Sequence, residues 1–278
     1  MPVLHAIVLG LVQGITEFLP ISSSGHLQLV PWLLGWDDFA GRQGVEQAFD
    51  ASLHLGTLAG VVAYLWSDVS GLARGGIQSL TRRGPVTREG RTAWLLVASA
   101  VPAAALGAAL DDTFARMGEA EWGIGLGLVV FGLVLAWADR LVGNRAVENF
   151  ELRDAMFMGA AQAIALSPGV SRSGITMTAA RRLGYTRDAA ARLSFLMGLP
   201  VIAGALVWSG LGILNGGLPA GMGLPLAIGV ATSGVSGWIA VWAILRIIRT
   251  RTFTPFVIYR VIAGVGVMAL AAGGFRAG

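Results

Sequence analysis

The sequence predicts an all-α integral membrane protein, built as an inverted-topology repeat with six transmembrane helices and two re-entrant helical hairpins. Three observations carry this prediction: an apolar composition, the spacing of the apolar runs, and a short motif that recurs in the second half. Of the 278 residues, 55% are hydrophobic and 13% are charged, whereas soluble domains carry about 25% charged residues. Cysteine is absent, which excludes disulfides and thiolate chemistry.

The basic residues indicate topology rather than nucleic-acid binding. All twenty are arginine, and most lie in short segments between apolar runs, as the positive-inside rule describes. The N-terminal stretch MPVLHAIVLG has no basic n-region and no cleavage site of a secretory signal. We therefore expect this stretch to belong to the mature protein.

Apolar runs of two lengths alternate in a regular order. A helix needs roughly 20 apolar residues to span a bilayer. Six runs are long enough or nearly so: about 50–66, 92–110, 122–139, 190–212, 224–248 and 254–274. Four are too short: about 2–15, 23–35, 153–166 and 173–183. The order is two short runs and three long ones, twice, which predicts one membrane domain over 1–278 with repeats at about 1–140 and 141–278.

A sequence match supports this repeat. Residues 10–25 laid over residues 159–174 agree at six of sixteen positions, at an offset of 149. The matched pairs are Gly10/Gly159, Gln13/Gln162, Ile15/Ile164, Ser22/Ser171, Ser24/Ser173 and Gly25/Gly174. The match falls where the pattern of apolar runs starts again.

The arginine distribution assigns the sides of the membrane. Four segments hold five, three, four and three arginines, and we place them in the cytoplasm: 67–91, 140–153, 178–192 and 246–251. The segments between them hold one arginine or none. With these four segments in the cytoplasm, neither pair of short helices, 2–15 with 23–35 or 153–166 with 173–183, can cross the membrane. Each pair enters the membrane and returns to the same side, the first pair from outside and the second from inside. Inverted pairs of this kind meet near the midplane of the bilayer.

The tips of the two hairpins carry the polar residues. In the second tip, Pro168 and Gly169 break the helix, and the guanidinium of Arg172 suits phosphate. Each tip is followed by a helix whose N-terminal amides favour an anion. Two facing tips predict a pocket for a group of phosphate type, with hydroxyl and backbone donors from Ser22, Ser24, Ser171, Ser173, Gly174 and Thr176.

The first tip adds groups that can do chemistry. A carboxylate within a membrane is costly unless it is paired or functional, and Glu17 can pair with Arg172 or bind a divalent cation. Gln13 lies on the same helix face as Glu17, at i and i+4. His26 can act as a base, an acid or a nucleophile. The combination predicts phosphoryl transfer or phosphate-ester hydrolysis.

The motifs QGITEFLPISSSGH (13–26) and PGVSRSGIT (168–176) resemble the two signatures of the undecaprenyl pyrophosphate phosphatase family, BacA or UppP. The resemblance covers essentially the whole chain. It implies a multi-pass enzyme of the bacterial inner membrane that converts undecaprenyl pyrophosphate to the monophosphate lipid carrier for wall synthesis. It further implies a divalent cation (Mg²⁺ or Ca²⁺), a pocket open to the periplasmic side, and an association with bacitracin resistance.

By motif position, the resemblance gives each site residue a role. Glu17 would be the metal or acid–base group, with Gln13 beside it as a metal ligand. Ser23 and His26 would be the nucleophile and the base, in an order that the sequence leaves open. Arg172 would hold the pyrophosphate together with the hydroxyls of the two tips. Gln13 stands where relatives often carry Glu, so we expect weaker cation affinity with activity retained.

Several alternatives stay open at this point. Glu17 and Arg172 could form a purely structural pair, and the fold would also suit a transporter of undecaprenyl phosphate. The histidine phosphatase class with a lysine in its first block is set aside because the chain has no lysine.

His54 is expected to be a core histidine or to lie near the pocket mouth. Arg260 is expected to face protein or an interface. The expected partners are the lipid substrate, the bilayer and a second copy of the chain, with no nucleic acid.

Overall fold

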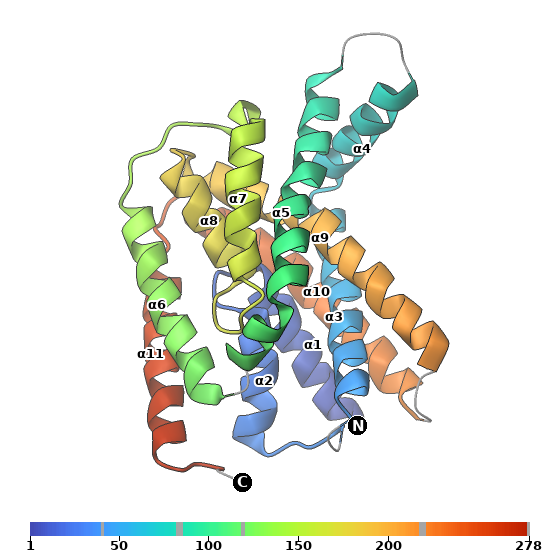
Figure 1. Cartoon of the computed structure of the whole chain (residues 1–278), viewed down its shortest axis with the longest axis vertical. Coiled ribbons are helices and arrows are strands. Elements are labelled where there is room, and N and C mark those ends of the chain that lie inside the picture. Colours follow the sequence, from blue (N-terminus) through green and yellow to red (C-terminus); the bar gives the residue numbers. More distant parts are fainter. Residues whose placement is uncertain (40–41, 82–85, 118–119, 217–220, 277–278) are drawn as a thin grey trace.

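The computed structural model describes residues 1–278 except 40–41, 82–85, 118–119, 217–220 and 277–278, and within this part it is helical throughout (Figure 1). The helices are α1 (Val3–Phe18), α2 (Ser23–Leu34), α3 (Gln43–Tyr64), α4 (Trp66–Thr81), α5 (Arg88–Met117), α6 (Glu121–Asp139), the short 3₁₀ helix η1 (Val147–Asn149), α7 (Leu152–Ile164), α8 (Arg172–Arg182), α9 (Arg187–Gly216), α10 (Gly223–Ile248) and α11 (Thr254–Ala272). The prediction of an all-α protein is confirmed.

Among the described residues, four helices are long and apolar enough to cross a membrane: Glu121–Asp139, Arg187–Val207, Gly223–Ile248 and Thr254–Ala272. The bent pair of α3 and α4 makes a fifth crossing if the pair is one span. The chain is therefore a multi-pass membrane protein. The sixth predicted crossing is α5, whose 30 residues are long enough to span, and its assignment stays a prediction.

Helix α4 corrects the sequence interpretation, in which residues 67–91 are only a cytoplasmic segment. After Leu65 the chain turns by 92° and continues as α4, which packs along the first part of α5. The two backbones touch at Gly75 and Gly90, where a Cβ on Gly75 would lie 2.6 Å from the Gly90 nitrogen. A helix as polar as α4 gives no apolar run, so the pattern of apolar runs does not predict it.

Helices of the two predicted halves pack against one another. Helix α1 packs along α10 of the other half, and α7 packs along α5. Gly10 allows the first contact, since a Cβ there would lie 2.0 Å from the Thr232 hydroxyl. Gly159, its match in the repeat, allows the second, since a Cβ would lie 2.2 Å from the carbonyl oxygen of Ser99. Small residues at membrane helix interfaces permit this close approach. The repeat bounds and the opposite membrane orientations of the halves stay predictions.

The two hairpins approach one another from opposite ends of the molecule. Figure 1 shows α1 and α2 in the lower half and α7 and α8 in the upper half, with their connecting loops meeting between them. The tips are joined by direct hydrogen bonds: the Gly169 amide donates to the Ser22 hydroxyl at 3.1 Å, and the Ser173 hydroxyl donates to the Leu19 carbonyl at 2.9 Å.

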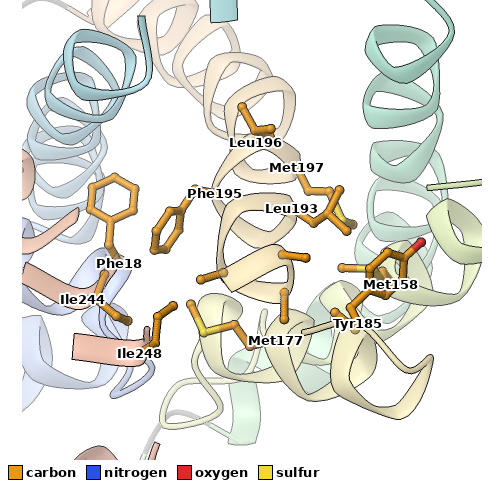
Figure 2. Packing of buried hydrophobic residues seen from close by; sticks show 14 of the residues in the cluster. Phe18, Met158, Met177, Tyr185, Leu193, Phe195, Leu196, Met197, Ile244 and Ile248 are labelled. Carbon is orange, nitrogen blue, oxygen red and sulfur yellow. The ribbon is translucent and has the colours of Figure 1, made fainter. Parts of the chain in front are cut away.

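The largest apolar cluster gathers around α9 and fixes the end of α1. Phe18 is fully buried, and its ring meets that of Phe195 edge to face, with the ring centroids 5.4 Å apart. Figure 2 shows the two rings side by side, with Ile244 and Met177 in the same cluster. Because Phe18 directly follows Glu17, this packing positions the carboxylate.

Candidate active site

Glu17 lies at the centre of the site, in the last turn of α1. Its Oε1 accepts a hydrogen bond from Arg172 Nη2 at 2.9 Å, and its Oε2 accepts one from the Ser23 hydroxyl at 2.6 Å. Gln13 Nε2 donates to Oε2 at 3.2 Å from one turn earlier. The carboxylate side chain is only 4% exposed. The structure thus brings together four of the predicted site residues, Gln13, Glu17, Ser23 and Arg172.

Ser23 and Arg172 hold equivalent places in the two halves. Each is the first residue of its helix, α2 or α8, directly after a serine N-cap with a positive φ. The free amides and the positive dipole end of both helices therefore lie beside the Glu17 carboxylate, an environment that favours negative charge. A phosphate group that took the place of the carboxylate would meet the same donors.

Arg172 is held from the side of α9. Its Nη1 donates to the Ser194 carbonyl at 3.1 Å, and Gly198 leaves room for the guanidinium, since a Cβ there would lie 2.2 Å from Nη1. Thr176, one turn later, shares a hydrogen bond with the Ser194 hydroxyl at 2.7 Å. The planar fork of Arg172 is thereby aimed at Glu17 before any substrate arrives.

His54 also contacts the carboxylate. Its Nδ1 donates to the Asp50 carbonyl at 2.8 Å, and its Nε2 lies 3.5 Å from Glu17 Oε2. Since a carbonyl can only accept, Nδ1 carries the proton of this hydrogen bond, and Nε2 is the nitrogen that faces the carboxylate. The His54 side chain is 32% exposed. The sequence predicts a core histidine here or one near the pocket mouth, and the signal for the latter is that His54 follows Asp50 by one helical turn.

His26 makes no contact with this group of residues. Its Nδ1 donates to the Ser22 carbonyl at 2.7 Å, and its Nε2 accepts from the Tyr259 hydroxyl at 2.7 Å. The ring lies nearly parallel to that of Tyr259 and is buried. Both ring nitrogens are therefore engaged in holding the first tip to α11.

The predicted phosphate-binding hydroxyls differ in whether they are free to bind phosphate or already hydrogen-bonded within the protein. Ser22, Ser171, Ser173 and Thr176 are buried and already hydrogen-bonded within and between the tips. Ser24 is exposed, and the backbone of Gly174 packs beside Ser171 and Arg260. These residues build the tips, and the donors that face Glu17 come from Ser23, Gln13, Arg172 and His54.

Arg260 is completely buried and joins both tips to α6. Its guanidinium donates to five backbone carbonyls, those of Pro20, Gly127, Leu128, Gly169 and Val170, at 2.8–3.2 Å. The expectation that it faces protein is met. The five-donor fork of arginine suits the carbonyls of Pro20, Gly169 and Val170, which lie in the tips outside the helices.

The oxygen atoms around Glu17 fit a single hard cation. Gln13 Oε1 is buried and has no hydrogen-bond partner among the described residues, so it is an acceptor that lacks a donor. Glu17, this amide oxygen and the Ser23 hydroxyl are oxygen ligands, which Mg²⁺ and Ca²⁺ prefer. Within the part of the chain that the structure describes, no three acidic or histidine side chains gather as a metal cluster. Mg²⁺ commonly needs only one or two carboxylates when substrate phosphates supply further ligands.

The chain is similar in sequence to known proteins over nearly its whole length. Residues 6–266 match the family model described as "Bacitracin resistance protein BacA". The chain is 45% identical to an undecaprenyl-diphosphatase of Pelobacter propionicus over 97% of each chain. It is 45% identical to one of Geobacter sulfurreducens, over 97% of this chain and 98% of the relative. It is 42% identical to one of a Nocardioides species, over 98% of this chain and 97% of the relative.

Proposed function

The chain belongs to the BacA family, and we propose that it is an undecaprenyl-diphosphatase, which cleaves the terminal phosphate from undecaprenyl pyrophosphate. The product, undecaprenyl phosphate, is the lipid carrier for cell-wall synthesis, and bacitracin resistance would follow from its replenishment. One observation supports the chemistry above all: a serine hydroxyl at a helix N-terminus donates to a buried carboxylate that an arginine also holds.

In the proposed reaction, the terminal phosphate replaces the carboxylate as the acceptor of the Arg172 donors. Glu17 is then free to take the proton of Ser23, and the Ser23 oxygen forms a bond to phosphorus while the bond to the bridging oxygen breaks. Undecaprenyl phosphate leaves. Glu17 passes the proton from Ser23 to the leaving phosphate or to solvent, which restores the carboxylate. Water then attacks the phosphoserine and gives a proton to Glu17, the bond between phosphorus and the Ser23 oxygen breaks, Glu17 returns the proton to that oxygen, and inorganic phosphate is released.

The contacts favour Ser23 over His26 as the nucleophile. Ser23 faces the carboxylate at 2.6 Å, whereas both nitrogens of His26 hold neighbouring structure. His54 can pass protons between Glu17 and water because it lies beside the carboxylate and its side chain is 32% exposed.

We propose that Glu17 and Gln13 hold a divalent cation, Mg²⁺ or Ca²⁺. When bound, such a cation neutralises phosphate charge and polarises the phosphorus. The unpartnered Gln13 Oε1 is the feature that supports the proposal.

We propose a position in the bacterial inner membrane with the site reached from the periplasmic side, as the likeness to the BacA family implies. The positive-inside count bears only on which segments face the cytoplasm. A homodimer stays an expectation.

Transport of undecaprenyl phosphate is the less favoured function, because carriage needs only a binding pocket, whereas Ser23 and Glu17 are arranged for proton transfer.

Phosphate release from undecaprenyl pyrophosphate by the purified protein in detergent tests the function. We expect release by the wild type and a fall in kcat of at least about 100-fold in Ser23→Ala and Glu17→Gln, the range typical of acid–base and nucleophilic groups. Ser70→Ala on α4 is the matched control. Absence of release by folded wild-type protein would overturn the function. Ser23→Ala within tenfold of wild type would overturn the role of Ser23 alone.

A further inference from the structure

A cavity of about 400 Å³ lies between α5, α7 and α9 and ends at Arg172. These three helices are neighbours in Figure 1. The walls are mostly small and apolar, among them Ala103, Ala165, Pro200 and Gly204, and the polar wall residues are Gln162 and Arg172. The volume falls within the range of about 300–1,000 Å³ that small-molecule sites occupy.

The polar end of this cavity lacks partners. The Gln162 side chain is 3% exposed, and neither its Nε2 nor its Oε1 has a hydrogen-bond partner among the described residues. Arg172 Nε is likewise buried and unpartnered. A buried amide left with no hydrogen bond is unfavourable, so orphaned groups of this kind indicate a missing partner.

An apolar cavity with unpartnered donors at one end matches an amphiphile with an anionic head. The wall residue Arg172 also holds Glu17, so the cavity adjoins the reaction site from the side of the second half. The isoprenoid tail of the lipid substrate needs an apolar environment where it extends away from the reacting phosphates. This cavity provides such an environment next to Arg172.

We propose that this cavity binds the first isoprene units of the lipid substrate, and that Gln162 donates to the phosphate that stays on the lipid. The inference rests on the proposed function, and it deepens that function by assigning the chain-binding part of the site. It also gives a role to Gln162, the counterpart of Gln13 in the repeat. Gln13 would act at the phosphate that is cleaved off, whereas Gln162 would bind the phosphate that stays on the lipid.

Gly204 offers a way to fill the cavity without disturbing the fold. It is exposed, and a Cβ placed on it meets no atom within 4 Å. Gly266 on α11 is also exposed with an open Cβ position and does not line the cavity. Gly204→Phe is therefore the test variant, and Gly266→Phe is its matched control.

We expect Gly204→Phe to raise the KM for undecaprenyl pyrophosphate at least tenfold, with hydrolysis of methyl diphosphate, which has no chain, unchanged. Gly266→Phe should behave as wild type with both substrates. Equal KM values for the two variants would overturn the inference. An equal loss of activity toward methyl diphosphate in Gly204→Phe would also overturn it, because the residue would then act on the reaction site rather than on the chain.

A binding experiment separates this inference from the proposed function. Farnesyl phosphate carrying a photoreactive diazirine in its first isoprene units resembles the product and needs no hydrolysis. We expect it to label residues 100–104 or 200–205, with at least tenfold weaker labelling in Gln162→Met and no change in Gln78→Met. Labelling elsewhere, or equal competition by unbranched decyl phosphate, would overturn the inference. Correct labelling without phosphate release from any substrate would overturn the proposed function and leave the binding site standing.

Discussion

Ser22 and Ser171, which occupy matching positions of the two halves, share one unusual backbone conformation and make one type of capping hydrogen bond. Their φ angles are +77° and +75°, and each hydroxyl accepts from the amide three residues later, Gly25 or Gly174. Residues other than glycine rarely adopt positive φ, and such positions concentrate at functional sites. The pair sets the directions in which Ser23 and Arg172 leave the tips.

Ser22→Ala is expected to lower the free energy of unfolding by about 1–3 kcal/mol, because it removes a cap and the acceptor of the buried Gly169 amide. Ser22→Gly loses the same hydrogen bonds but relieves the positive φ, so it should be about 1 kcal/mol more stable than Ser22→Ala. Equilibrium unfolding in mixed detergent micelles measures both. Equal stability of the two variants would show that the backbone is not strained at this position.

Arg260→Met should destabilise the protein by at least about 3 kcal/mol, since it leaves several buried carbonyls of the two tips without a donor. Arg260→Lys should restore only part of this loss, because an ammonium group cannot reach five acceptors in a plane. Arg246→Met, at an exposed position of α10, serves as the control. Thermal unfolding in detergent is the measurement, and a lysine variant as stable as wild type would contradict the expectation.

His54→Gln is expected to lower kcat about tenfold or more, because the amide keeps a donor near Glu17 but cannot carry a proton away. KM should change little. The matched control is His5→Gln, since His5 also faces a carboxylate, that of Asp38 at 2.7 Å, outside the site. Steady-state phosphate release measures kcat and KM for both variants. Equal kcat values in the two variants would exclude His54 from proton transfer.

Gln13→Glu should raise the apparent affinity for Mg²⁺ or Ca²⁺ about tenfold, since it places a second carboxylate beside Glu17 where the amide oxygen has no donor. The rise in melting temperature with added cation measures affinity without turnover. Removal of cations with a chelator should abolish phosphate release in wild type and variant. A melting temperature that does not respond to cation in either protein would rule out a cation at these residues.

The sequence by itself determined the apolar helices of the membrane domain and the breaks at the two tips, but not the polar helix α4. Hydropathy, helix breakers and caps are local properties, so the Pro20 and Pro168 segments and the serine caps could be assigned from neighbouring residues alone. The contact between Gln13 and Glu17 also follows from helical spacing. The pairing of Glu17 with Arg172 could be predicted because the repeat brings two tips together.

Only the tertiary structure decided which side chains complete the site. His54 reaches Glu17 because α3 packs beside α10 and α1, whereas His26 turns to Tyr259, which lies 233 residues away. The five carbonyls that Arg260 satisfies come from α6 and both tips. Each of these contacts depends on which face of one helix meets a distant segment, and that choice is set by the packing of all the helices together rather than by the residues next to it.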